Sequence, residues 1–145
     1  MELQNRVKFP ATASCLDKDG YITEEFIDYQ LARVRGGCGL NTPEDCRVHA
    51  RTASSHNLGI WNDTFIPGMK QLSEAIHAEG GKICVQFDKG GLANWLVAPE
   101  KPVFIPSDIT FYSRDFKGVD KAMIHEVAES YGSAAARAAK IPLKI

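Results

Sequence analysis

Gln86 is the residue whose type and position point most directly to binding chemistry. It stands near the end of an otherwise apolar, strand-like segment at residues 82–87, where a buried carboxamide needs hydrogen-bond partners. A carboxamide both donates and accepts hydrogen bonds, so it suits a ligand edge that offers both kinds of group. The competing interpretation is a solvent-facing glutamine on an edge strand, and the sequence favours the ligand-binding one.

Metal chemistry is not indicated by the histidines or the cysteines. The histidines are scattered, and none pairs with a carboxylate at metal-ligand spacing: His49, His56, His77 and His125. The cysteines include no C-x-x-C pair: Cys15, Cys38, Cys46 and Cys84. We therefore predict no metal site and expect four thiols in a reducing compartment.

Composition places the chain among ordinary globular proteins. It has 145 residues, of which 44% are hydrophobic and 24% charged, with a net charge of −1. That charge predicts no nucleic-acid partner, and the lack of a long apolar run predicts no membrane partner. The first residues have no apolar stretch typical of a signal peptide, so a cytoplasmic location is expected.

Strands and helices are expected to alternate along the chain. The expected strands are short and end near Pro, Gly or polar residues: residues 7–13, 38–42 and 82–87. Each expected helix has an apolar stripe at helical spacing: Ile27, Leu31 and Val34; Phe65, Met69, Leu72 and Ile76; Ile124, Val127, Tyr131, Ala134 and Ala138. Thr23, Asp63 and Asp120 are the predicted N-caps. Residues 44–61 and 89–117 are expected to be long loops.

This order predicts an α/β fold with a parallel sheet. The longer connections follow the strands, whereas glycine turns at residues 36–37 and 80–81 join helices to strands. Such asymmetry is typical of a barrel or a doubly wound sheet whose site lies at the carboxyl ends of the strands.

Several segments together resemble the old yellow enzyme family of NADH:flavin oxidoreductases. The matching stretches are L-Q-N-R-V at residues 3–7, D-G-x-I-T at 19–23, G-G-x-G-L at 36–40, L-G-I-W-x-D at 58–63, I-P-G at 66–68 and H-x-x-G-x-K-I-x-x-Q at 77–86. Each stretch alone would be weak evidence for the family. Their order and spacing over almost the whole chain make the resemblance strong.

The resemblance implies a partial (β/α)₈ TIM barrel with roughly the first three β/α units at residues 1–140. A complete barrel of this kind needs ~250 residues. Residues 141–145 depart from the family pattern and are expected to form a tail outside it. The implied cofactors are FMN and, as reductant, NAD(P)H; the flavin passes hydride to an activated C=C bond or a related small-molecule substrate.

The resemblance also implies which residues contact the flavin. Residues 10–13 (Pro10, Ala11, Thr12 and Ala13) match the loop that lies along the ring, where small side chains let the backbone approach closely. Gln86 matches a glutamine that hydrogen-bonds the pyrimidine edge. Asp45 stands where the family usually has alanine, and its carboxylate would oppose the charge of a reduced flavin. We therefore expect only a backbone contact from Asp45.

Two further residues are expected near the substrate. Lys89 stands where the family commonly has a histidine and offers a point charge, although a solvated loop lysine is an equal alternative. Cys15 lies two residues beyond the position of a cysteine that some members use, and it could face the pocket. The family's catalytic residues and phosphate-binding segments have no counterpart in these 145 residues.

The sequence leaves the working form of the protein open. One hypothesis is an FMN oxidoreductase that acts only when complete or when complemented by a chain that carries the rest. Another is an inactive, truncated remnant that self-associates through open sheet edges. A flavodoxin-like binding module is the least favoured, because residues 10–14 make a poor phosphate loop. Open edges also predict poor autonomous stability.

Overall fold

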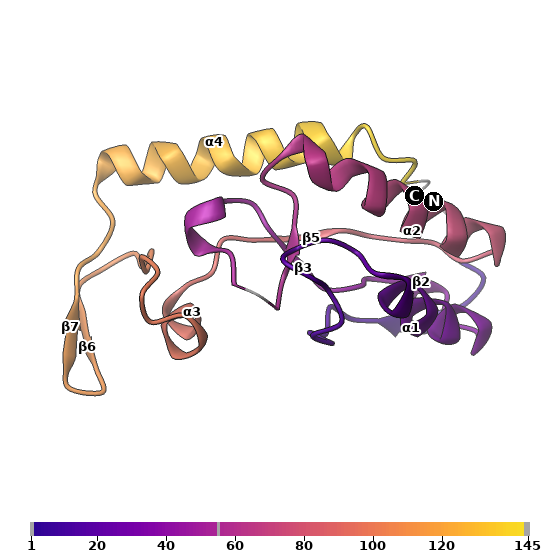
Figure 1. Ribbon diagram of the computed structural model, residues 1–145, viewed down its shortest axis with the longest axis horizontal. Coiled ribbons are helices and arrows are strands. Elements are labelled where there is room, and N and C mark those ends of the chain that lie inside the picture. The colour runs from indigo at the N-terminus through magenta and orange to yellow at the C-terminus, as the bar shows by residue number, and fades with distance from the viewer. Residues whose placement is uncertain (1, 55, 144–145) are drawn as a thin grey trace.

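Parallel pairing links the first and second barrel strands. The computed structural model (Figure 1) describes residues 2–54 and 56–143. In it, β1 (Lys8–Phe9) pairs in parallel with β2 (Leu40–Asn41). Asn41 then forms a parallel bridge with Ile83, so the third barrel strand begins beside the second. The strands expected at residues 7–13 and 38–42 are confirmed, but each is only two residues long, near the start of the first range and within the second.

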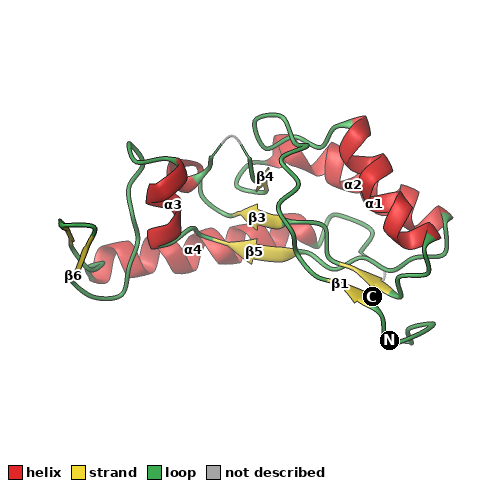
Figure 2. Cartoon of the chain, turned by 90° about the horizontal axis from the view of Figure 1, so that it is seen from below, coloured by secondary structure: helices red, strands yellow, loops and turns green. Residues whose placement is uncertain are grey.

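The second and third barrel strands continue side by side toward their carboxyl ends. β3 (Asp45–Arg47) pairs in parallel with β5 (Gln86–Asp88) and on its other side with β4 (Leu58–Gly59). Figure 2 shows β3 and β5 as adjacent arrows that point the same way. The register sets Arg47 opposite Asp88, so that their side chains can form an ion pair.

The three predicted helices form around the expected stripes. α1 (Glu24–Arg35) has Thr23 as its N-cap, and the Thr23 hydroxyl accepts a hydrogen bond from the Phe26 amide at 3.1 Å. α4 (Lys121–Ala138) has Asp120 as its N-cap in the same way. α2 (Ile66–Ala78) supplies the third. The predicted alternation of strands and helices is therefore confirmed.

The predicted cap of α2 was wrong. The N-cap position of α2 is Phe65, which makes no side-chain capping hydrogen bond. Asn62 instead caps the short turn before the helix, by accepting a hydrogen bond from the Thr64 amide at 3.0 Å. Asp63 lies inside a 3₁₀ turn, Asp63–Phe65, that precedes α2. Its carboxylate accepts instead from Arg137 at 2.8 Å and Lys140 at 2.9 Å, because the end of α4 packs beside this turn.

Both segments expected to be long loops contain short elements, so those predictions were wrong. Residues 44–61 contain β3, the 3₁₀ turn Ala50–Thr52 and β4. Residues 89–117 contain α3 (Leu92–Val97) and the antiparallel hairpin of β6 (Ile109–Phe111) and β7 (Arg114–Phe116). Elements of two to six residues are too short to show a hydrophobic period in the sequence.

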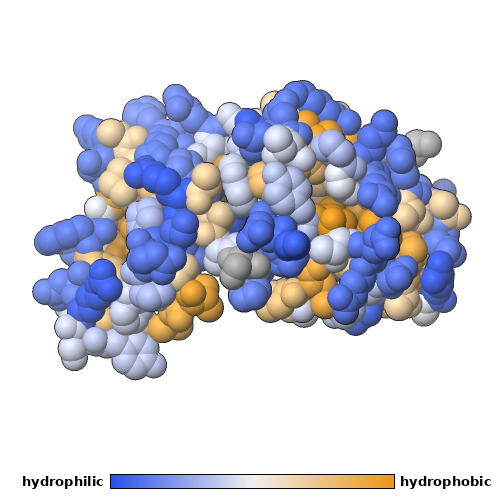
Figure 3. All heavy atoms as spheres, viewed as in Figure 1, coloured by the Kyte–Doolittle hydropathy of each residue, from blue (hydrophilic) through white to orange (hydrophobic). Residues whose placement is uncertain are grey.

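The core lies between the strands, α1, α2 and the second half of α4. Its most deeply buried apolar side chains are at most 1% exposed: Phe26, Cys46, Leu58, Ile60, Leu72, Ile76 and Ala134. The first half of α4 extends beyond this core toward the hairpin (Figure 1). Ile124 there is 54% exposed, so its predicted place on the buried face was wrong. Hydrophilic side chains dominate the face in Figure 3.

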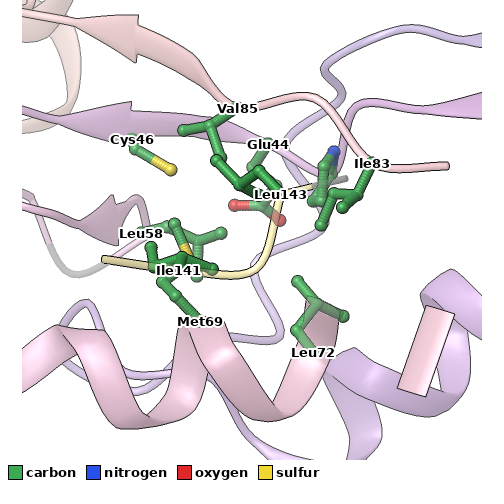
Figure 4. A pocket seen from close by; sticks show the side chains of 10 residues that line it. Glu44, Cys46, Leu58, Met69, Leu72, Ile83, Val85, Ile141 and Leu143 are labelled. Atoms are coloured by element: carbon green, nitrogen blue, oxygen red, sulfur yellow. The ribbon is translucent and has the colours of Figure 1, made fainter. Parts of the chain in front are cut away.

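The segment after α4 packs into the core. Ile141 is 5% exposed, Leu143 packs against the same cluster, and the Ser73 hydroxyl donates to the Pro142 carbonyl at 2.8 Å. Figure 4 shows Ile141 and Leu143 beside Met69 and Val85. Part of the tail predicted at residues 141–145, namely residues 144–145, lies outside the described residues. No helix in the described part of the chain is long and apolar enough to cross a membrane.

Candidate cofactor and substrate site

A cavity of about 420 Å³ lies at the carboxyl ends of the strands. Loop 10–15 after β1, the ends of β3 and β5, and α3 all contribute to it. Its lining includes Ala13, Cys15, Arg47, His56, Asp88, Gly90 and Asn94. Two residues predicted for cofactor or substrate, Ala13 and Cys15, are therefore brought to one cavity. Such a position, at the carboxyl ends of parallel strands, is where α/β proteins bind ligands.

Arg47 is the central charge of this cavity, and sequence reasoning missed it. Its side chain is 9% exposed, and its guanidinium forms ion pairs with Asp88 and, at 3.5 Å, with Asp45. Its Nε also donates to the Asn57 side-chain oxygen at 3.1 Å. Burial lowers the pKa of Arg47, and the Asp45 carboxylate opposes that shift. The available signal was a charged residue between the apolar Cys46 and Val48.

Asp45 makes contacts that offset its charge. Its Oδ2 accepts a hydrogen bond from the Asn57 amide at 3.2 Å and lies 3.5 Å from the Arg47 guanidinium. The carboxylate therefore has a cation and an amide donor, which reduces the conflict expected with a reduced flavin. Its backbone contact with the cofactor stays a prediction.

Gln86 is exposed, so the expectation that its amide is buried was wrong. β5 is the outer strand of the three-stranded sheet, and this matches the alternative of a solvent-facing glutamine on an edge strand. Across residues 2–54 and 56–143, no hydrogen bond engages its side chain. Both the donor and the acceptor of the amide are thus available, and its cofactor role stays a prediction.

Glu44 holds loop 10–15 against the end of the second barrel strand. One carboxylate oxygen, Oε1, accepts from the Ser14 amide at 2.6 Å and from the Ser14 hydroxyl, and the Thr12 amide donates to the Pro43 carbonyl at 3.2 Å. Glu44 is fully buried, and burial raises its pKa although the Ser14 hydrogen bonds oppose that shift. The positions of residues 10–13 therefore depend on Glu44.

The Glu44 carboxylate points into a small apolar space between the strands and α2 (Figure 4). Leu58, Leu72, Val85 and Leu143 are among its walls. Its volume is only about 10 Å³, roughly the room that one water needs. This space is part of the packed core and has no room for a cofactor.

Lys89 does not line the cavity that Cys15 lines. It is 6% exposed and lines a second pocket, with its Nζ 3.9 Å from the centre of the Phe104 ring. Burial lowers the pKa of Lys89 to about 8. The burial of Lys89 rules out the alternative of a solvated loop lysine. Its contact with the substrate stays a prediction.

The residues present fit the ring of a flavin better than its phosphate. Ala13 and two glycines, Gly90 and Gly91, keep part of the cavity wall small. A Cβ at Gly90 would lie 3.3 Å from the Arg47 guanidinium, and Gly90 has φ +74°, so a larger residue is disfavoured there. Arg47 is the one lysine or arginine in the lining over the described residues, and carboxylates already pair with it. The same ranges contain no cluster of metal-ligating side chains.

Solved structures define the class of fold. Over 97% of its length the chain superposes on 40% of the Old Yellow Enzyme from Pichia sp. AKU4542, with a TM-score of 0.81 and 21% identity. Morphinone reductase gives a TM-score of 0.79 at 23% identity, over 99% of this chain and 43% of that one. The fold is therefore part of a (β/α)₈ TIM barrel of the old yellow enzyme type.

The chain belongs to the NADH:flavin oxidoreductase / NADH oxidase family, whose model matches residues 1–142. The NADPH dehydrogenase of Bacillus subtilis (strain 168) is 30% identical over 143 residues, which are 95% of this chain and 41% of that protein. A metal reductase of Desulforamulus reducens is 28% identical over 141 residues, 95% of this chain and 21% of that protein. The chain thus spans less than half the length of the relatives it matches. FMN and NAD(P)H are the cofactors of this family.

Proposed function

We propose that this chain supplies the first part of an FMN-dependent NAD(P)H oxidoreductase. The observation that carries the proposal is the cavity at the carboxyl ends of the strands, into which Ala13 and Cys15 project from a loop held by Glu44. When bound, FMN supplies hydride transfer from NAD(P)H to an activated C=C bond or a related small-molecule substrate. The protein's own part is to bind and orient both molecules.

Each cofactor-site residue has a separate task in this proposal. The backbone of Pro10, Ala11, Thr12 and Ala13 lies along one face of the ring, and Gln86 donates to and accepts from the pyrimidine edge. Asp45 contributes only its backbone, since Arg47 and Asn57 bind its carboxylate. Cys15, exposed at the cavity with φ +58°, faces the substrate.

The rest of the barrel must come from elsewhere in this proposal. The chain spans 41% of the Bacillus subtilis relative, and its cavity has no unpaired lysine or arginine among the described residues to hold a phosphate. The remaining β/α units, in the same longer protein or in a second chain, would supply the phosphate site and the substrate-orienting residues. The 145-residue chain alone is then expected to be inactive.

The proposal is tested by titrating the 145-residue chain, alone and mixed with the remaining barrel segment, with FMN while the quenching of FMN fluorescence is measured. Saturable binding is expected, and Gln86→Ala should weaken it because the amide edge contact is lost. Gln71→Ala is the matched control, since Gln71 is an exposed glutamine on the distant α2. Lack of binding by the chain, both alone and mixed with the remaining barrel segment, would favour the inactive remnant.

A further inference from the structure

Lys89 is an unusual lysine, because its charged end is buried without a hydrogen-bond acceptor. The residue is 6% exposed, and its Nζ has no hydrogen-bond partner among the described residues. Its Nζ does lie 3.9 Å from the centre of the Phe104 ring, which is a favourable contact for a cation. Burial of an ammonium without an acceptor is costly, so such a group indicates a place where an anion binds.

The Glu126 carboxylate forms no hydrogen bond with Lys89. Glu126 is close enough to raise the pKa of Lys89, but its Oε1 already pairs with Arg51 and, at 2.7 Å, with His49. Arg51 adds positive charge to the same neighbourhood, and its coulombic effect lowers the pKa of Lys89 further. Burial and the charge of Lys89 lower the pKa of His49, so its imidazole is mainly neutral at pH 7. An additional anion at Nζ would therefore be attracted by Lys89 and Arg51.

Lys89 lines a separate pocket of about 240 Å³ between the loop at residues 104–106 and α4. The rest of the lining is mainly apolar or aromatic, and includes Phe104, Val119, Ile124, Val127 and Tyr131. Gly90 is the one residue that this pocket shares with the cavity of Arg47 and Cys15. One ammonium at an apolar pocket matches a ligand with one negative charge and an apolar body.

We propose that this pocket binds a small monocarboxylate with a short aliphatic chain or ring. The carboxylate accepts from the Lys89 ammonium, and the apolar body lies against Val127 and Phe104. Phosphate is disfavoured, because the apolar walls would leave its other oxygens without donors. This site goes beyond the proposed flavin function and does not require FMN.

Calorimetric titration of the 145-residue chain with hexanoate at pH 7 tests the proposal, with 1-hexanol as the uncharged ligand of equal length. Below its pKa of about 8 the Lys89 amine is mainly protonated. We expect saturable hexanoate binding, tighter than hexanol by about tenfold or more, the value of a hydrogen bond to a charged group. Equal affinities, or no saturable binding of hexanoate, would overturn the proposal.

Variants separate this pocket from unspecific binding. Lys89→Met keeps most of the length of the side chain without its charge and should reduce hexanoate affinity to that of hexanol. Lys121→Met, at an exposed lysine at the start of α4, should leave both affinities unchanged. Val127→Trp should block both ligands by filling the pocket. If Lys89→Met still prefers hexanoate, the assignment of Lys89 as the anion site is wrong.

Discussion

The barrel segment and the excursion after its third strand are stabilised in different ways. The barrel segment, residues 7–88 with the second half of α4, buries one continuous apolar cluster in which Leu72 and Ile76 are fully buried. The excursion, residues 89–119, is stabilised by contacts between aromatic rings around Trp95. The ring centroids of Trp95 and Phe116 lie 5.4 Å apart. The first region thus has a core of its own, and the second depends on a few side chains.

Both regions bury polar side chains, and these differ in what binds them. Glu44 in the barrel segment is buried but bound by Ser14, and this fixes a loop of the candidate site. In the excursion, the Lys89 ammonium and both polar atoms of the Asn94 side chain are buried without hydrogen-bond partners in the described part of the chain. Unsatisfied groups cost stability and are retained where ligands bind. The barrel segment also has buried side-chain atoms without hydrogen-bond partners in the described part of the chain, among them both polar atoms of Gln30 and Oε2 of Glu44. The ligand role inferred for Lys89 therefore depends on the pocket that it lines and not on the missing partner alone.

The largest effect is expected from truncation in the core of the barrel segment. Leu72→Ala removes a fully buried side chain and should lower the free energy of unfolding by about 2–5 kcal/mol. Leu96→Ala, in the excursion at 58% exposure, should change it by no more than about 0.5 kcal/mol. Urea unfolding followed by circular dichroism compares the two. Similar losses for both variants would refute a core confined to the barrel segment.

Trp95→Ala should produce a smaller and local effect. Trp95 contacts the rings of Phe111 and Phe116, and aromatic pairs are worth about 0.5–1.5 kcal/mol each beyond the area they bury. Limited proteolysis should therefore cut faster within residues 89–119, while cleavage in residues 7–88 keeps its rate. Faster cleavage in both regions would mean that the excursion supports the barrel segment.

The helices of the barrel segment could be predicted because each has an apolar stripe, and two of them also have a local side-chain cap. The caps Thr23 and Asp120 were predicted correctly. Asp63 was not a cap, because it lies inside a 3₁₀ turn and α2 begins after Phe65 without a side-chain cap. The apolar stripe of α4 correctly predicted that Ala134 is buried. It was wrong for Ile124, because that residue lies on the half of the helix that extends beyond the core. Local signals predict where a helix forms, but only the tertiary structure decides how much of its stripe is buried.

The candidate site was predictable only in part, for the same reason. Ala13 and Cys15 follow β1 directly, so topology brings them to the cavity. The pairing of Arg47 with Asp88 depends on the register between β3 and β5, which the sequence does not display. The exposure of Gln86 depends on which strands flank β5, and the alternative interpretation described it correctly.

Lys89 should give the excursion a stability that rises in alkali. The folded state disfavours the ammonium, because burial lowers its pKa from 10.5 to about 8. Between these values the unfolded chain binds the proton more readily, so raising the pH removes a penalty from the folded state alone. The free energy of unfolding should increase by at most about 1.4 kcal/mol per pH unit in this window. Lys89→Met should lack this increase when unfolding is measured from pH 7.5 to 10.

Glu44 should give the barrel segment the opposite and smallest response. Burial raises its pKa above 4.5, although the hydrogen bonds from Ser14 offset part of the shift. The folded state therefore holds the proton more tightly than the unfolded chain, and its contribution to stability is present at low pH and lost as the pH rises through the folded pKa. Glu44→Gln keeps an acceptor for Ser14 without the charge. Relative to the unchanged protein, this variant should gain stability between pH 4 and pH 7 in urea unfolding. A constant difference over that range would mean that Glu44 is ionised at the same pH in both states, and that its contacts with Ser14 fully compensate its burial.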